Sequence, residues 1–354
     1  MVNKTSPIPT IENRKSGLDI VRVIACFFVI MIHVTEQGFF EFSNFWNICV
    51  AYDALSRMCV PLFFILSGYL LLNGRPLPLK VFYQRRFLRI LVPFFITLII
   101  YSVHESWSIT NLLYNVLSAQ VSFHLWFVYT LIGIYLVIPL FQHLFAPPHT
   151  HPEVYERKSI VKLYVIIWFI SAICYSTAKS YFDWKLDLFA VFNFHYFYGY
   201  LGYFFIGGLL RDYNFSRPLR LISIVIWLLA TILIYYSTVF HSAELNKPDG
   251  LFLHYLSIFV VLQATSFFIA LKDADLKFYG LEFVSNHTYW IYLIHILVLY
   301  PVQSFLHLYV DDNTLLTIPL ISILVFFVSF ALSIPLMGIE KLIFQFLGGL
   351  LIKR

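Results

Sequence analysis

Ten long apolar segments divide this sequence, and they limit the possible fold more than any other feature. Each comes close to or exceeds the roughly 20 residues that a helix needs to cross a bilayer. Because lipid offers no hydrogen bonds to the backbone, such segments must be helical. Hydrophobic residues make up 60% of the 354 residues, more than a soluble core of this size could bury. We expect an all-α, polytopic membrane bundle of about ten transmembrane helices, near residues 18–36, 49–73, 87–104, 124–145, 159–178, 194–210, 219–240, 251–271, 287–306 and 314–337.

Lysine and arginine residues are distributed unevenly between the two sets of connecting segments. Most of the 24 lie in the N-terminal tail, the C-terminal tail and every second loop. The exceptions are Lys179, Lys185 and Lys247 in the other loops, and Arg22 and Arg57 within spans. The positive-inside rule then places both termini, including the tail of residues 1–17, in the cytoplasm. The short loops predict a single transmembrane domain over residues 1–354.

Several functional classes find no support in the sequence. The net charge of +5 does not indicate nucleic-acid binding, because the basic residues cluster at the ends of spans. No metal-ligand spacing, P-loop or Rossmann glycine pattern is present, so we expect no metal and no tightly bound cofactor. The cysteines, with no C-x-x-C pair among them, are interpreted as packing residues: Cys26, Cys49, Cys59 and Cys174.

The first span carries an arginine and a histidine on one face. Arg22 and His33 are eleven residues apart, which is about three helical turns and roughly 16 Å along the axis. Asp19 precedes Arg22 by one turn and is placed to pair with it. In one interpretation, Asp19 and Arg22 form an interfacial pair and His33 belongs to the aromatic belt. In the other, His33 is a general base, since a histidine's ordinary pKa of about 6.5 suits proton transfer at neutral pH.

The second span holds two further candidates. Arg57 follows Asp53 by one turn, at a depth close to that of His33. Either the pair only neutralises itself and joins two helices, or Arg57 binds an acceptor or stabilises developing negative charge. Ser67, Gly68 and Tyr69 lie deeper, where they serve either helix packing or a polar channel.

Basic and aromatic residues open or occupy three later spans. Arg86 and Arg89, in YQRRFLRI, share a helix face at the cytoplasmic end, where they bind either phosphates or lipid headgroups. The other candidates are helix-bridging hydrogen bonders or members of an acceptor or oxyanion site: His124, Trp126, Tyr292 and His295.

Taken in order, these motifs resemble the acyltransferase-3 family of integral membrane O-acyltransferases. The series is Arg-x10-His, VPLFFILSGYLL, Arg86-x-x-Arg89, FHLWFVYTLIGIYLVIPL and YWIYLIHI, and it is densest over residues 18–145. The closest likeness is to stand-alone bacterial glycan O-acetyltransferases such as that of enterobacterial common antigen. We expect no C-terminal SGNH domain of the kind that many glycan acetylases carry.

The resemblance implies a membrane O-acyltransferase that moves an acyl group, most simply acetyl, from cytoplasmic acetyl-CoA to a hydroxyl of a cell-surface or lipid-linked glycan. It implies that Arg86 and Arg89 contact the CoA phosphates and that Arg22 steers the donor. It also implies that His33 either activates the acceptor hydroxyl or carries the acyl group transiently. Ser67, Gly68 and Tyr69 would line the donor channel. The expected setting is the bacterial cytoplasmic (inner) membrane. Homo-oligomers and a glycan exporter or permease are alternatives that the sequence leaves open.

Overall fold

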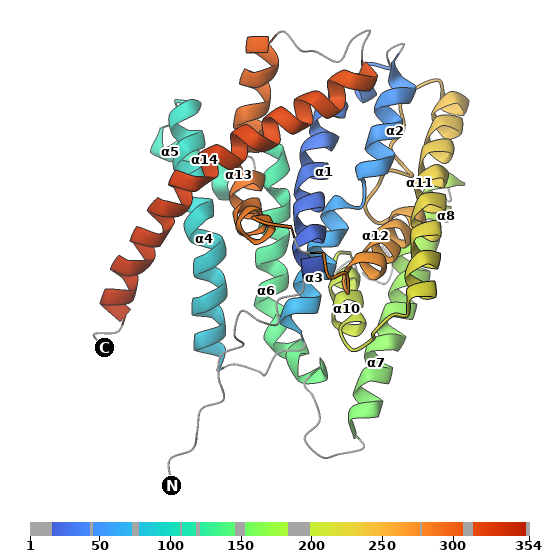
Figure 1. The fold of residues 1–354 in the computed structure, drawn as a ribbon, viewed down its shortest axis with the longest axis horizontal. Helices are drawn as coiled ribbons and strands as arrows, with labels where there is room; N and C mark the ends of the chain where they lie inside the picture. Colours follow the sequence, from blue (N-terminus) through green and yellow to red (C-terminus); the bar gives the residue numbers. More distant parts are fainter. Residues whose placement is uncertain are drawn as a thin grey trace.

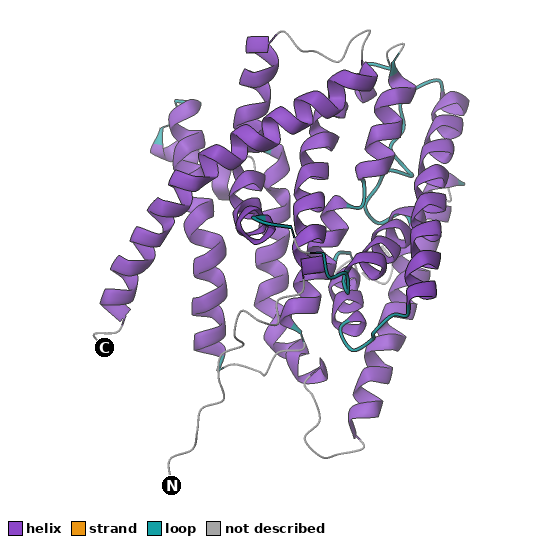
Figure 2. Cartoon of the chain, viewed as in Figure 1, coloured by secondary structure: helices purple, strands orange, loops and turns teal. Residues whose placement is uncertain are grey.

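The computed structural model describes residues 16–42, 45–72, 78–106, 108–117, 121–145, 153–182, 199–276, 278–306 and 314–351. Within these ranges the chain is helical and contains no strand (Figure 2). The helices are α1 (Ser16–Phe40), α2 (Trp46–Ser56), α3 (Cys59–Leu71), α4 (Leu79–His104), α5 (Ile109–Leu117), η2 (Phe123–Leu125), α6 (Trp126–Phe145), α7 (Glu153–Trp168), η3 (Phe169–Tyr175), α8 (Ser176–Tyr181), α10 (Leu201–Leu210), α11 (Arg217–Leu245), α12 (Ile258–Leu271), α13 (Leu281–Leu306) and α14 (Thr314–Leu351).

The all-α membrane bundle is confirmed, with eight helices in the described ranges that are long and apolar enough to cross a bilayer. Helix α1 lies inside the bundle and packs against α2, α3, α12, α13 and α14. Helix α14 crosses obliquely in front of α13 and α1 (Figure 1). At about 1.5 Å per residue, its 38 residues exceed the thickness of a hydrocarbon core of about 30 Å. A tilted course accommodates that length.

The predicted sixth and eighth spans contain short helices rather than full crossings. Helix α10 has 10 residues and α12 has 14. Residues 194–198 of the predicted sixth span lie outside the described ranges. Residues 251–257 of the eighth form turns. Helix α12 begins only after Ser257, whose hydroxyl accepts from the amide of Val260 and caps the helix. Irregular backbone is tolerated at membrane depth where it is buried in protein or lines a cavity.

The predicted second span is broken into α2 and α3 at Arg57 and Met58. Pro61 has no N–H, so the carbonyl of Arg57 lacks its usual helical donor four residues later. The regular pattern resumes with the bond from Leu62 N to Met58 O (2.9 Å). The break coincides with the buried ion pair of Arg57, so the sequence interrupts the helix at a candidate site residue.

Close packing around α10 explains glycines whose role was open in the sequence. A Cβ on Gly68 would lie 1.8 Å from the backbone oxygen of Phe204, and one on Gly207 would lie 1.9 Å from that of Ile65. Helices α3 and α10 therefore touch backbone to backbone. Small residues commonly allow this approach in membrane helices.

Candidate active site

A cavity of about 650 Å³ opens between α1, α3, α4, α6, α13 and α14. It gathers the beginnings of α1, α4 and α13 and the end of α14, the helix ends that the charge distribution assigns to the cytoplasm. Its polar and charged lining residues are Arg22, Ser67, Arg89, Tyr135, Ser285, Asn286, Thr288, Tyr289, Trp290, Tyr292, Glu340 and Lys341. The cavity is thus a deep pocket with basic groups in its wall.

Arg22 reaches this cavity through a network that also involves α13. Its Nη1 donates to Ser285 Oγ at 3.2 Å and lies 3.7 Å from Asp19 Oδ1. The Ser285 hydroxyl in turn donates to Asp19 at 2.5 Å. The pairing of Asp19 with Arg22 was predicted from spacing, whereas Ser285 was not. The network fixes the guanidinium at the cavity wall while Asp19 stays buried.

The basic residues of α4 occupy different places. Arg89 lines the cavity together with Lys341 and Glu340 of α14. Glu340 is held by the indole N–H of Trp290 at 2.6 Å. Arg86 is not among the described lining residues. It is half-buried and interacts electrostatically with Tyr135, which does line the cavity.

The Ser67, Gly68 and Tyr69 triplet is divided by the structure. Ser67 lines the cavity, whereas Gly68 faces α10. The ring of Tyr69 lies 5.7 Å from that of Phe268. The guanidinium of Arg211 lies over the Tyr69 ring, 5.8 Å from the ring centroid. The described wall of this cavity thus includes Ser67 but neither Gly68 nor Tyr69, and a donor channel lined by all three stays a prediction. Successive residues of a helix point about 100° apart, so these three positions face different neighbours.

Three histidines from separate helices form a cluster that the sequence did not predict as one group. The rings of His33 and His295 stack with centroids 5.3 Å apart, and those of His124 and His295 lie 4.8 Å apart. His33 and His124 complete the group at 6.3 Å. Within the described residues, no set of histidine, cysteine and carboxylate side chains is arranged to hold a metal ion. The cluster offers imidazole groups for proton transfer or hydrogen bonding.

Hydrogen bonds define which histidine nitrogens carry lone pairs. His295 Nδ1 lies 2.6 Å from the carbonyl oxygen of Tyr292, which can only accept, so this nitrogen donates. In the neutral ring, Nε2 then holds a lone pair, and it has no hydrogen-bond partner in the described part of the chain. His124 pairs with the Ser122 hydroxyl at 2.9 Å and with the carbonyl of Leu293 at 3.4 Å. His295 therefore presents an unused acceptor inside the cluster.

Glu36 orients His33 and was missed in the sequence. Nδ1 of His33 lies 3.3 Å from Glu36 Oε2, one turn further along α1. Because a carboxylate accepts, Nδ1 donates and the lone pair of the neutral ring lies on Nε2. An acid that holds an imidazole in one tautomer is the arrangement found in hydrolase triads. The i, i+3 spacing of His33 and Glu36 could have revealed this pair.

Tyr292 joins the cavity to the histidine cluster. It lines the cavity, and its ring lies 5.7 Å from that of His124 and 5.9 Å from that of His295. Its hydroxyl donates to the backbone carbonyl of His124. That single proton is therefore already engaged, which disfavours the predicted role of Tyr292 as an oxyanion donor.

Arg57 and Asp53 form the predicted ion pair at 2.8 Å, with Asp53 almost fully buried. The Arg57 guanidinium also lies over the ring of Tyr255 at 5.3 Å, and its Nε–H has no hydrogen-bond partner in the described ranges. Trp126 packs on the same Tyr255 at 5.9 Å. Arg57 thus retains a buried donor that the ion pair does not use.

The sequence model of the Acyltransferase domain family (acyltransferase-3) matches residues 15–337. The chain belongs to the acyltransferase-3 family. The match contains the histidine cluster and the Arg57–Asp53 pair, and it ends before Glu340 and Lys341 of the cavity wall. No curated protein and no solved structure matches the chain.

Membership of the acyltransferase-3 family makes the protein a membrane acyltransferase and confirms the resemblance seen in the sequence. Several residues of its candidate site were not singled out in the sequence. They come from α1, α6, α13 and α14: Glu36, Tyr135, Ser285, Asn286, Thr288, Tyr289, Trp290, Glu340 and Lys341. Polar residues scattered along long helices show no recognisable spacing in the sequence. Their grouping is therefore visible only in the folded structure.

Proposed function

We propose that this acyltransferase moves an acyl group, most simply acetyl, from cytoplasmic acyl-CoA to a hydroxyl of a cell-surface or lipid-linked glycan. It would work in the bacterial cytoplasmic membrane. The observation that supports this most strongly is the basic cavity whose wall includes Tyr292, because Tyr292 also contacts the histidine cluster. A donor anchored by its phosphates at one end would present its thioester toward His33 at the other.

Arg89, assisted by Arg86 and Lys341, would bind the nucleotide phosphates. Guanidinium groups bind phosphates through paired, charge-assisted hydrogen bonds. Arg22 would guide the pantetheine arm past Ser67. A rotation of Phe127 or Tyr292, which contact each other at 5.5 Å, would open the remaining path to the histidines. The nucleotide would stay outside the hydrocarbon, where its charges remain solvated.

Acyl transfer would then proceed in a single step. His33 Nε2 takes the proton of the acceptor hydroxyl as that oxygen attacks the thioester carbonyl carbon. A C–O bond forms, the C–S bond breaks, and the leaving thiolate takes the proton back from His33 as CoA thiol. Arg57, through its unused Nε–H, would stabilise the developing oxyanion. Removing such a donor typically costs about 3–4 kcal/mol of transition-state stabilisation. The exporter alternative has no observation in its favour.

The first test concerns the base. The full chain is reconstituted in lipid nanodiscs with radiolabelled acetyl-CoA and membrane glycans. His33→Ala should fold and bind acetyl-CoA like the parent, yet transfer no label above the uncatalysed rate. His104→Ala, at an exposed histidine of α4, is the matched control and should be fully active. Normal transfer by His33→Ala would exclude His33 as the base.

The second test concerns the donor site. Arg86→Ala combined with Arg89→Ala should weaken acetyl-CoA binding at least about tenfold, since hydrogen bonds to charged groups contribute about 1.5–3 kcal/mol each. Binding of acetyl-pantetheine, which has no nucleotide phosphates, should be unaffected. Arg85→Ala, on the same helix turn but not described in the cavity wall, is the control. Equal losses for both ligands would contradict the phosphate assignment.

A further inference from the structure

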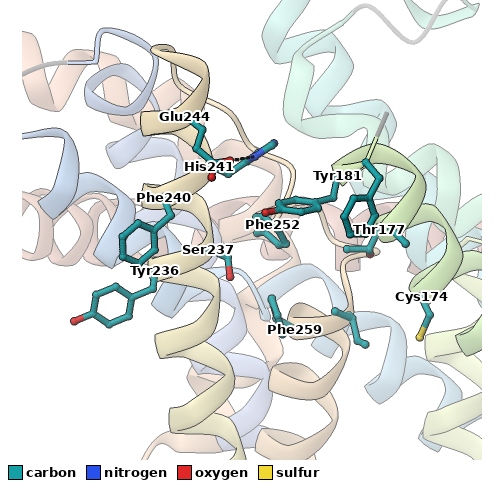
Figure 3. A pocket seen from close by; sticks show the side chains of 13 residues that line it. Cys174, Thr177, Tyr181, Tyr236, Ser237, Phe240, His241, Glu244, Phe252 and Phe259 are labelled. Carbon is teal, nitrogen blue, oxygen red and sulfur yellow. Dashed lines mark ion pairs between the residues drawn. The ribbon is translucent and has the colours of Figure 1, made fainter. Parts of the chain in front are cut away.

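Two more cavities lie side by side, near the ends of α8 and α11. These ends are distant from the cavity lined by Arg22 and Arg89, which we call the donor cavity. One, of about 510 Å³, lies between α8 and α11 (Figure 3). The other, of about 500 Å³, lies against the loop of residues 246–257. Thr177 and His241 line both. The two cavities therefore meet at these side chains, and both volumes are typical of ligand sites.

The first cavity, which we call the aromatic groove, is mostly apolar. Its aromatic lining residues are Tyr181, Phe182, Tyr236, Phe240, Phe252 and Phe259. Phe240 is 65% exposed and Tyr236 is 52% exposed on α11, a helix that would face lipid over much of its length. A hydrocarbon chain in the membrane could enter such a groove from the side.

The second cavity, which we call the polar pocket, carries hydrogen-bonding groups. They are Thr177, Ser180, His241, Asp249, His254 and Ser257. The loop is held in shape by its own bonds: Asp249 Oδ1 accepts from Leu251 N at 2.8 Å, and Ser242 Oγ accepts from Asp249 N at 3.0 Å. A fixed wall of hydroxyl, imidazole and carboxylate groups suits a polyhydroxylated ligand.

The polar pocket is adjacent in the chain to the candidate active site. His254 lines the pocket, and the next residue, Tyr255, lies beneath the guanidinium of Arg57. His254 also interacts electrostatically with Arg57. Only one short turn of the loop would thus separate a ligand in the polar pocket from Arg57, the residue proposed to stabilise the transition state.

We infer that the acceptor is a lipid-linked saccharide, with its sugar in the polar pocket and its hydrocarbon chain in the aromatic groove. The inference rests on the proposed function and narrows its acceptor. A water-soluble polymer has no apolar part that could fill a groove open to lipid. An ordinary phospholipid has no polyhydroxylated group to pair with the hydroxyls, imidazole groups and carboxylate of the adjoining pocket. Only an amphipathic sugar lipid matches both cavities and their continuity at His241.

Photolabelling tests occupancy without relying on activity. The full chain in nanodiscs is irradiated with farnesyl phosphoglucose that carries a terminal diazirine, and the labelled peptides are identified by mass spectrometry. Label should appear on residues 174–182 and 236–244. Ser237→Trp, which fills the groove, should reduce it at least about fivefold, whereas Ile232→Trp, on an exposed part of α11, should not. Equal labelling by a diazirine phosphatidylcholine, or no effect of Ser237→Trp, would overturn the inference.

Transfer assays separate this inference from the proposed function. Ser180→Trp, which blocks the polar pocket, should lower transfer from acetyl-CoA to lipid-linked saccharide at least about tenfold and leave acetyl-CoA affinity unchanged. Ile232→Trp, on an exposed part of α11 that lines neither cavity, should transfer like the parent. If Ser180→Trp transfers normally, the polar pocket is not the acceptor site even though the enzyme is an acyltransferase. If the parent labels the groove but acylates no saccharide, the proposed function fails and the lipid-sugar site stands.

Discussion

The reactivity of a histidine depends on which of its nitrogens is free, and at His33 a neighbouring carboxylate decides this. Glu36 accepts from Nδ1 at 3.3 Å, which leaves the lone pair of the neutral ring on Nε2, the proposed base. The Glu36 side chain is 41% exposed, so the pair is only partly shielded from solvent. Its contribution should be orientation of the ring rather than strong electrostatic stabilisation.

Glu36→Gln should therefore slow transfer by about tenfold without changing acetyl-CoA affinity, because a positioned base contributes roughly 10²–10⁴-fold and a misoriented one retains part of this. An amide can also donate and so favours no single tautomer of His33. Single-turnover transfer with saturating acetyl-CoA measures the effect on chemistry alone.

The matched control is Glu41→Gln, at the end of the same helix. Glu41 accepts from Gln37 at the surface and has no contact with the histidines in the described structure. It should transfer at the parent rate. Equal rates for the parent and Glu36→Gln would show that His33 needs no orienting acid.

Local spacing predicts contacts within one helix and fails for contacts between helices. The pairs of Asp19 with Arg22 and of Asp53 with Arg57 both form as expected. Ser285, whose hydroxyl ties Arg22 to α13, is 263 residues away in the chain. Nothing in a single sequence indicates that partner, because only the packing of α1 on α13 brings it within reach.

At the scale of elements, the crossing of α3 and α10 depends on residues without side chains. Gly68→Ala would place a methyl group 1.8 Å from the Phe204 carbonyl oxygen, and backbone cannot move aside as a flexible side chain can. Overpacking of this kind typically costs about 1–3 kcal/mol. We expect Gly68→Ala to lower the thermal unfolding temperature clearly in detergent, measured by size-exclusion chromatography after heating.

Gly133→Ala supplies the comparison for that measurement. Gly133 is exposed on α6, and an added Cβ there meets no atom within 4 Å. Alanine is also the better helix former, so this variant should be as stable as the parent or slightly more stable. Equal unfolding temperatures for the two alanine variants would contradict the close α3–α10 contact.

Hydropathy located the helices well and their interruptions poorly. The long helices lie at the predicted positions. The break at Arg57, the loop before α12 and the short helix α5 were not anticipated, because a window average over about 20 residues hides a few irregular ones. Signals for two of them were present locally, since Pro61 removes an amide donor and Ser257 is a favourable N-cap. The break at Arg57 and the loop before α12 contain residues of the proposed oxyanion and acceptor sites.

At the scale of the whole molecule, helix direction separates the two proposed substrate sites. The donor cavity collects Arg22 and Arg89 from the first halves of α1 and α4, and Lys341 from the second half of α14. The histidine cluster collects His33 near the end of α1 and His124 just before α6, toward the other side. The charge distribution predicted this polarity from the sequence. It could not predict that one cavity would join six helices, because hydropathy places spans without placing them beside one another.

The proposed direction of transfer requires the beginning of α4 to face the cytoplasm and its end to face outward. Replacing either Arg85 or Ser106 by cysteine tests this orientation in intact cells. In both variants Cys174, the least buried of the native cysteines, is replaced by serine. A membrane-impermeant maleimide should label Ser106→Cys directly, because Ser106 is exposed in the turn after α4. It should label Arg85→Cys only after the membrane is permeabilised. The opposite pattern would place Arg89 and the donor cavity outside the cell, where acyl-CoA is not supplied, and the mechanism would fail together with the orientation.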